Sequence, residues 1–138
     1  MDNYLDNPYV WLHIHDGILY ARYKKDIKVN LAAAKSIVKA RLEFTEYQDM
    51  KLIMYIQGVA NLDADARNYI TSSEGVKGII AAAVIVDSFF AKVISQVVRH
   101  INKPLIPIKE CYNEKQALDW LNTINQGVGN GQKNKYPQ

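Results

Sequence analysis

The segment IIAAAVIV, residues 79–86, decides the fold class of this chain because it is an uninterrupted run of apolar residues. Such a run, with loop or cap residues on both sides, is typical of a β-strand that is covered on both faces. Strands of this kind belong to sheets with helices packed against them. The run is also far shorter than the roughly 20 apolar residues that cross a bilayer, so we expect no transmembrane segment.

The residues that follow this strand predict a helix and a further strand. Asp87 and Ser88 end the strand and cap the segment 89–102, FFAKVISQVVRHIN, whose apolar residues recur at helical spacing. Pro104 ends that helix, and the segment 104–110, PLIPIKE, is predicted to be a short strand. Its prolines cannot donate hydrogen bonds to a neighbouring strand, which favours a position at the edge of the sheet.

The N-terminal half of the chain begins with a predicted β-hairpin. Two β-prone runs, residues 9–15 and 18–23, flank Asp16-Gly17, a dipeptide that favours a two-residue hairpin turn. Asn30 then precedes residues 31–44, whose apolar residues have helical spacing, so Asn30 is the predicted cap of a helix.

Further elements continue the alternation of helices and strands. The segment 51–58, KLIMYIQG, is predicted to be a short strand that ends at Gly58. Near the C-terminus, Asn113 is the predicted cap of a helix over residues 114–125, with Gln116 at the capping-box position.

These elements predict one α/β domain over residues 1–125, with an N-terminal β-hairpin, alternating helices and strands, and a mixed sheet covered by helices. Residues 126–138, QGVGNGQKNKYPQ, are rich in glycine and nearly free of apolar side chains. We predict that they form a disordered tail.

The C-terminal half of this pattern resembles the SpoIIAA-like branch of the STAS superfamily, also described as STAS/SEC14-like. The resemblance is carried by AAAVIVDS at residues 81–88, by the amphipathic segment after it, and by the closing Ala-Leu-x-Trp-Leu pattern at residues 117–121. It covers about residues 9–125 and implies a mixed sheet surrounded by helices. It also implies a regulator, or a module that binds small ligands or lipids.

One functional feature of that superfamily has no counterpart here. Its anti-sigma-factor antagonists carry a phosphorylated serine at the start of the helix after the third strand. The matching position in this chain lies in the sequence Asp63-Ala64-Asp65-Ala66, and Ala64 has no hydroxyl group. The resemblance therefore does not imply a phosphorylation switch at this position.

Asp63 and Asp65 could hold a metal ion, act on a phosphate, or begin a helix. A divalent cation needs three or more converging oxygen ligands, and the next acid in the sequence is Glu74. We therefore interpret Asp63 as a helix cap and Asp65 as a residue of the first turn, which the helix dipole favours by about 0.3–1 kcal/mol. His13 and His15 share a strand face at a spacing that could bind a metal, but exposed strand histidines are the favoured interpretation. No metal and no cofactor are expected.

The charge and the cysteine content exclude several classes of function. The net charge is +3, but Lys133 and Lys135 lie in the tail, and without them 15 basic residues face 14 acidic ones, a net charge of +1. A nearly neutral domain has no electrostatic footprint for nucleic acid, so no nucleic-acid partner is expected. The single cysteine, Cys111, excludes an internal disulfide and a zinc cluster. The N-terminus lacks the pattern of a signal peptide, and we expect a cytoplasmic protein.

Together these observations predict a non-catalytic regulatory or ligand-binding module that acts through a protein partner or an apolar small molecule. The predicted working surface lies at the strand ends and the following helix starts, with Phe89 as its anchor. Its residues are Gln57, Gly58, Asp63, Asp65, Asp87, Ser88, Phe89 and Lys92.

Two alternatives stay open at this point. A small hydrolase or transferase could use Ser88 or Cys111 as its nucleophile. A homodimer could form through an exposed sheet edge or through the helix that carries Phe89.

Overall fold

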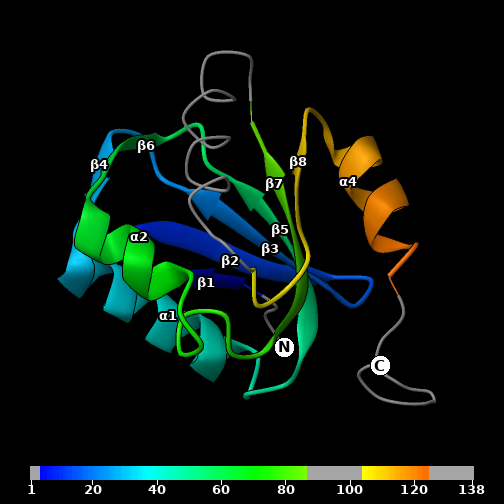
Figure 1. Ribbon diagram of the computed structural model, residues 1–138, viewed down its shortest axis with the longest axis horizontal. Coiled ribbons are helices and arrows are strands. Elements are labelled where there is room, and N and C mark those ends of the chain that lie inside the picture. The colour runs from blue at the N-terminus through cyan, green and yellow to red at the C-terminus, as the bar shows by residue number, and fades with distance from the viewer. Residues whose placement is uncertain (1–3, 87–103, 125–138) are drawn as a thin grey trace.

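The computed structural model describes residues 4–86 and 104–124, and the domain is built around one mixed sheet (Figure 1). The strands lie in the order β1-β2-β3-β5-β7-β8. Neighbours are antiparallel from β1 to β3 and parallel from β3 to β8. The strands span Tyr4–Asp6 (β1), Val10–His15 (β2), Ile18–Tyr23 (β3), Met50–Tyr55 (β5), Ile79–Ile85 (β7) and Ile108–Cys111 (β8). The predicted mixed α/β sheet is confirmed, and the proline-flanked strand β8 lies at an edge, as predicted.

The hairpin between β2 and β3 has the predicted turn. Asp16 and Gly17 both adopt positive φ angles, 50° and 77°. These angles give a two-residue connection whose twist matches that of the strands it joins. The register follows from this turn: His15 pairs with Ile18 and Val10 pairs with Tyr23.

Each helix in the described part of the chain begins at a polar residue that was predicted from the sequence. Helix α1 spans Leu31–Phe44, α2 spans Ala64–Ile70 and α4 spans Glu114–Leu121. The side chains of Asn30, Asp63 and Asn113 accept hydrogen bonds from the third backbone N–H of each helix, at 2.8, 2.9 and 2.8 Å. Such caps satisfy N–H groups that have no partner inside the helix. Asp65 lies in the first turn of α2, as predicted.

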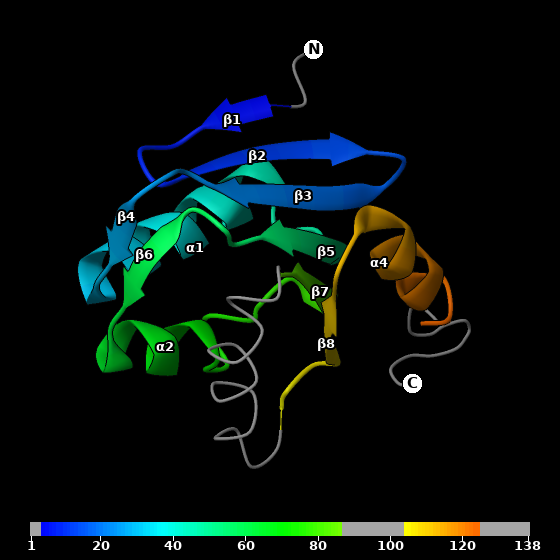
Figure 2. The same cartoon turned by 90° about the horizontal axis from the view of Figure 1, so that it is seen from above.

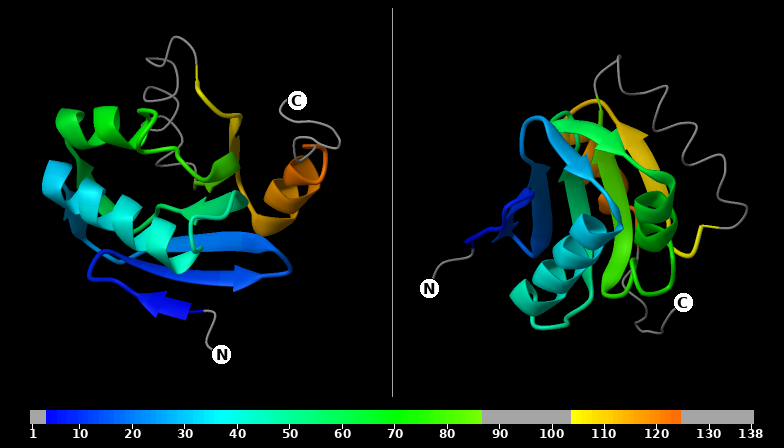
Figure 3. Two further views of the ribbon diagram at one scale, coloured as in Figure 1. Left: turned by 90° about the horizontal axis from the view of Figure 1, so that it is seen from below. Right: turned by 90° about the vertical axis from the view of Figure 1, so that its left-hand side faces the viewer.

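The helices cover the two faces of the sheet unequally. Figure 2 shows α1 and α2 on one side of the sheet and α4 on the other. Figure 3 shows α1 and α2 lying next to each other. On their side, Ala33, Ala34 and Ile37 of α1 and Ala66 of α2 join the core residues of the strands. On the other side, Ala117 and Leu121 of α4 pack with residues of β3, β5 and β7.

A second, two-stranded sheet aligns the starts of α1 and α2. Its strands are β4, Ile27–Val29, and β6, Val59–Leu62, which are parallel. Each strand leads directly into the cap of the next helix, and the backbone N–H of Asp63 donates to the carbonyl of Val29 at 3.2 Å. The pairing therefore brings together two helix starts that are distant in sequence.

The sequence analysis missed three strands and misplaced some boundaries. It did not predict β1, β4 or β6, which span only three or four residues each. The strand predicted over residues 51–58 ends at Tyr55, because the chain turns there toward β6. The side chain of Gln116 accepts from the backbone N–H of Tyr112, one residue before the position that a capping box requires. The predicted helix 89–102 and the predicted tail lie outside the described residues.

Gly58 connects β5 to β6 at a point where two backbone segments touch. A Cβ atom added there would lie 2.3 Å from the carbonyl oxygen of Lys24, which is shorter than any real contact. The carbonyl of Gly58 also accepts from the N–H of Ile27 at 3.3 Å. The glycine is therefore required for the close approach that starts the β4–β6 pair.

We expect Gly58→Ala to lower the free energy of unfolding by about 2 kcal/mol or more, because the backbone must move to admit the methyl group. Urea unfolding followed by circular dichroism measures the change. The control is Gln57→Ala at the exposed neighbouring position, which should change stability by less than about 0.5 kcal/mol. Equal stability of the two variants would contradict the steric argument.

Candidate functional site

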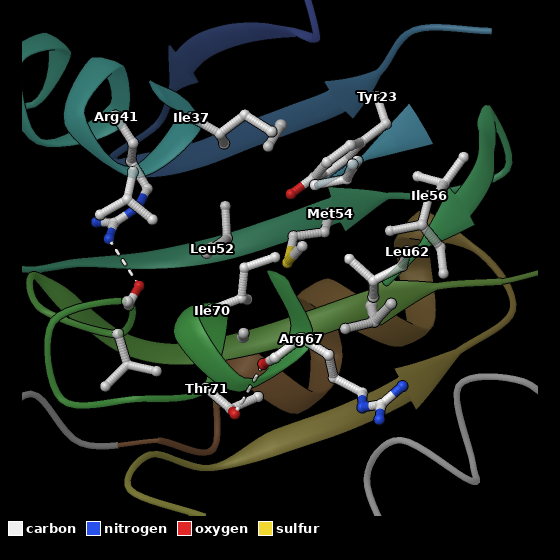
Figure 4. Close-up of a pocket in the computed structure, with 18 of the residues that line it drawn as sticks. Tyr23, Ile37, Arg41, Leu52, Met54, Ile56, Leu62, Arg67, Ile70 and Thr71 are labelled. Atoms are coloured by element: carbon white, nitrogen blue, oxygen red, sulfur yellow. Dashed lines mark hydrogen bonds between the residues drawn. The ribbon is translucent and has the colours of Figure 1, made fainter. Parts of the chain in front are cut away.

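An apolar pocket of about 430 Å³ lies between the sheet and the helices α1 and α2 (Figure 4). The strands contribute side chains from the face that points toward these helices, among them Leu12, Ala21, Leu52, Met54, Ala82, Val84 and Ile108. Helix α1 contributes Ile37, Val38 and Arg41, and helix α2 contributes Arg67 and Ile70. A volume of about 430 Å³ falls within the range of about 300–1,000 Å³ that is typical of small-molecule sites.

Small side chains on the strands account for the space. Ala21 of β3 and Ala82 of β7 point toward the pocket, and both are buried. In the same direction, α1 presents Ala33 and Ala34 to the core rather than larger residues. The β4–β6 pair holds the starts of α1 and α2 next to each other.

Arg41 is the most unusual residue that lines the pocket. It is 5% exposed, although it carries a guanidinium group. Its Nη2 atom donates to the carbonyl oxygen of Gly75 at 3.1 Å, whereas its Nη1 atom is buried without a hydrogen-bond partner. Figure 4 shows the side chain reaching from α1 toward that carbonyl, at one side of the group of apolar residues.

No acidic group in the described part of the chain balances the charge of Arg41, since no aspartate or glutamate there forms an ion pair with it. Burial lowers the pKa of the guanidinium, and among the residues that the structure describes the phenols of Tyr23 and Tyr69 act against this shift. An arginine nevertheless remains protonated at neutral pH, so a positive charge lies in an apolar wall.

Among the described residues, the other polar side chains that line the pocket belong to Tyr23, Asn61, Arg67 and Thr71. Burial raises the pKa of Tyr23 to about 12, so its phenol is neutral and can donate a hydrogen bond. The hydroxyl of Thr71 donates a hydrogen bond to the carbonyl oxygen of Arg67 at 3.0 Å, at the end of α2.

The four described residues of the predicted working surface do not line this pocket. Gln57, Asp63 and Asp65 are exposed, and Gly58 is half-buried. Their neighbours Ile56, Val59, Leu62 and Arg67 do line it, so this part of the predicted surface lies beside the pocket rather than in it. The other predicted residues, Asp87, Ser88, Phe89 and Lys92, lie outside the described residues.

His13, one of the two histidines considered as metal ligands, is held by stacking contacts. The ring of His13 is stacked between those of Tyr4 and Tyr20, with centroid distances of 5.1 and 4.6 Å. Burial and the nearby charge of Arg22 lower the pKa of His13. In the part of the chain that the structure describes, no three His, Cys, Asp or Glu residues are grouped so that they could hold a metal.

Cys111 ends β8 and faces α4 on the side of the sheet opposite to the pocket. It is 1% exposed and packs in the cluster that contains Ala83 and Leu121. Burial raises the pKa of its thiol, and the nearby charge of Lys109 only partly offsets this shift. The thiolate fraction at neutral pH is therefore low, which disfavours Cys111 as a nucleophile.

The sheet and its helices define an α/β protein with a SpoIIAA-like fold. The structure is similar to the crystal structure of an uncharacterised protein of the DUF3478 family, with a SpoIIAA-like fold, from Shewanella loihica PV-4. The TM-score is 0.56, with 13% sequence identity, over 85% of this chain and 98% of that one. This likeness confirms the fold that the sequence predicted.

Residues 11–125 match a family described as a domain of unknown function, DUF7793, and the chain belongs to that family. No curated protein matches the chain. Among the helices that the structure describes, none is long and apolar enough to cross a bilayer.

We expect the thiol of Cys111 to react with a disulfide reagent much more slowly in the folded protein than in urea, by a factor on the order of a hundred or more. The reason is that the buried thiol must be exposed by local opening before it can ionise and react. The release of the coloured thiol product measures both rates. Rapid reaction of the folded protein would support the hydrolase or transferase hypothesis instead.

Proposed function

We propose that this protein binds an apolar small molecule in the pocket between the sheet and the helices α1 and α2. The observation that carries the proposal is a pocket of about 430 Å³ with almost entirely apolar walls. Small-molecule sites typically occupy about 300–1,000 Å³, are lined mostly by hydrophobic side chains and contain a few polar groups. Each methylene group that such a ligand buries contributes about 0.8 kcal/mol.

The chemistry of the pocket wall supports binding rather than catalysis. Among the described residues that line the pocket, none is a carboxylate, a histidine or a cysteine. General acid–base and nucleophilic catalysis depend on such groups, placed within hydrogen-bonding distance of the reacting atoms. A ligand in this pocket would instead contact α1, α2 and the sheet together and stabilise the folded state by mass action.

A protein partner is the second candidate, and a separate surface favours it. Helix α4 covers only part of the far face of the sheet, and Tyr4 and Trp11 are 71% and 50% exposed. Lys24 lies 5.4 Å from the centre of the Trp11 ring. Aromatic residues such as tyrosine and tryptophan are enriched at protein interfaces relative to the rest of the surface. Native mass spectrometry of protein purified from its own cell extract separates the two candidates, since a ligand adds a small mass and a partner adds a protein.

We expect Ala82→Met to weaken the binding of an apolar ligand by about tenfold or more, because the new side chain occupies the pocket that the ligand needs. The probe is Nile red, an uncharged dye whose emission rises in apolar surroundings. Titration of the dye with the unchanged protein should give saturable binding of one dye per chain. Dodecanol should displace it.

The matched control is Ala32→Met, which makes the same change at an exposed position of α1. Methionine is a good helix former, so this variant should bind the dye as the unchanged protein does. Thermal unfolding of both variants shows whether the fold persists. Failure of the unchanged protein to bind Nile red or dodecanol, or equal binding by both variants, would overturn the proposal.

A further inference from the structure

The buried guanidinium of Arg41 requires an explanation that the apolar pocket alone does not supply. A buried donor without a partner costs about 1–3 kcal/mol, and more when the group is charged. Such groups are rare in folded proteins, and Nη1 of Arg41 is the one buried side-chain atom without a partner in the part of the chain described. What is missing at this position is a hydrogen-bond acceptor, and a negative charge would compensate the guanidinium best.

We propose that the ligand of this pocket is a single-chain carboxylate of the fatty-acid type, whose carboxylate binds Arg41 and whose chain lies along the apolar strand residues. The inference rests on the proposed function, because it names the ligand class of the same pocket. A carboxylate supplies both the missing acceptor and the missing charge. It also matches the fork of N–H donors that a guanidinium presents.

Arg41 is a better candidate for this contact than Arg67, the other arginine that lines the pocket. Arg67 is only half-buried, so its guanidinium keeps part of its hydration and can donate hydrogen bonds to water. Figure 4 shows the two side chains on opposite sides of the apolar residues. Arg41 has already lost its hydration in the folded protein. Binding of a carboxylate therefore adds only a small desolvation cost on the protein side.

The geometry also limits the way in which the ligand binds. Nη2 of Arg41 is held by the carbonyl of Gly75, so Nη1 is the atom left for the carboxylate. Nη1 has almost no accessible surface without ligand, so binding of the carboxylate requires the guanidinium to turn toward the pocket. A volume of about 430 Å³ lies near the lower end of the range for small-molecule sites, which favours one acyl chain over a two-chain lipid.

The test compares dodecanoate with dodecanol, which have the same chain and differ in the charged head. Displacement of Nile red at neutral pH measures both affinities for the unchanged protein, Arg41→Met and Arg67→Met. We expect the unchanged protein to bind dodecanoate at least about tenfold more tightly than dodecanol, as a hydrogen bond to a charged group implies. Arg41→Met should lose this preference and still bind dodecanol, whereas Arg67→Met should keep it.

The outcomes separate this inference from the proposed function. If neither compound binds the unchanged protein, the proposed function fails. If both bind equally well, the pocket is real and the carboxylate preference is wrong. If the preference survives in Arg41→Met, or is lost only in Arg67→Met, the assignment to Arg41 is wrong.

Thermal unfolding of Arg41→Met without ligand shows whether the fold persists. The midpoint is expected to fall moderately, because the substitution leaves the carbonyl of Gly75 without its donor. If the variant does not fold, Arg41 is structural and the assignment fails, and the comparison of acid and alcohol on the unchanged protein still decides the ligand class.

Discussion

The structure depends on the small side chains of β7, which point to both faces of the sheet. Ala81 and Ala83 point toward α4 and are fully buried, so the helix can approach the sheet closely through Ala117 and Leu121. Ala82 lies between them and points to the opposite face, where it lines the pocket. Because side chains alternate along a strand, the same run of alanines permits tight packing on one face and leaves space on the other.

Contacts at both ends connect the helices α1 and α2, which lie on the pocket side of the sheet. The β4–β6 pair connects their starts through the hydrogen bond between Asp63 and Val29. At the other end, Arg41 of α1 reaches the carbonyl of Gly75 in the loop after α2. The two helices are thus tied to each other at both ends. A collapse of one helix onto the sheet would have to break one of these connections.

The sequence predicted the features that depend on neighbouring residues. Asp16-Gly17 specified the hairpin turn, and Asn30, Asp63 and Asn113 specified the helix starts, because each acts on backbone groups within a few positions. The strands β4 and β6 were missed, since strands this short carry no periodic signal and form only because they pair with each other. The pocket and the burial of Arg41 were missed for the same reason: both arise from residues far apart in the sequence. On the helix pattern alone, Arg41 is simply a polar residue among apolar ones.

The hydrogen bond to Gly75 does not by itself explain why an arginine is buried at position 41. One carbonyl oxygen could be satisfied by a neutral donor, which would avoid the cost of placing a charge in an apolar wall. A guanidinium offers five donors, and this one uses Nη2 for the backbone while Nη1 has no partner. Departures from local packing rules are expected where a residue serves function rather than stability. A negatively charged acceptor supplied by a ligand would account for both the charge and the unused donor. The apolar walls of the pocket would then favour a ligand that carries this acceptor on an apolar chain.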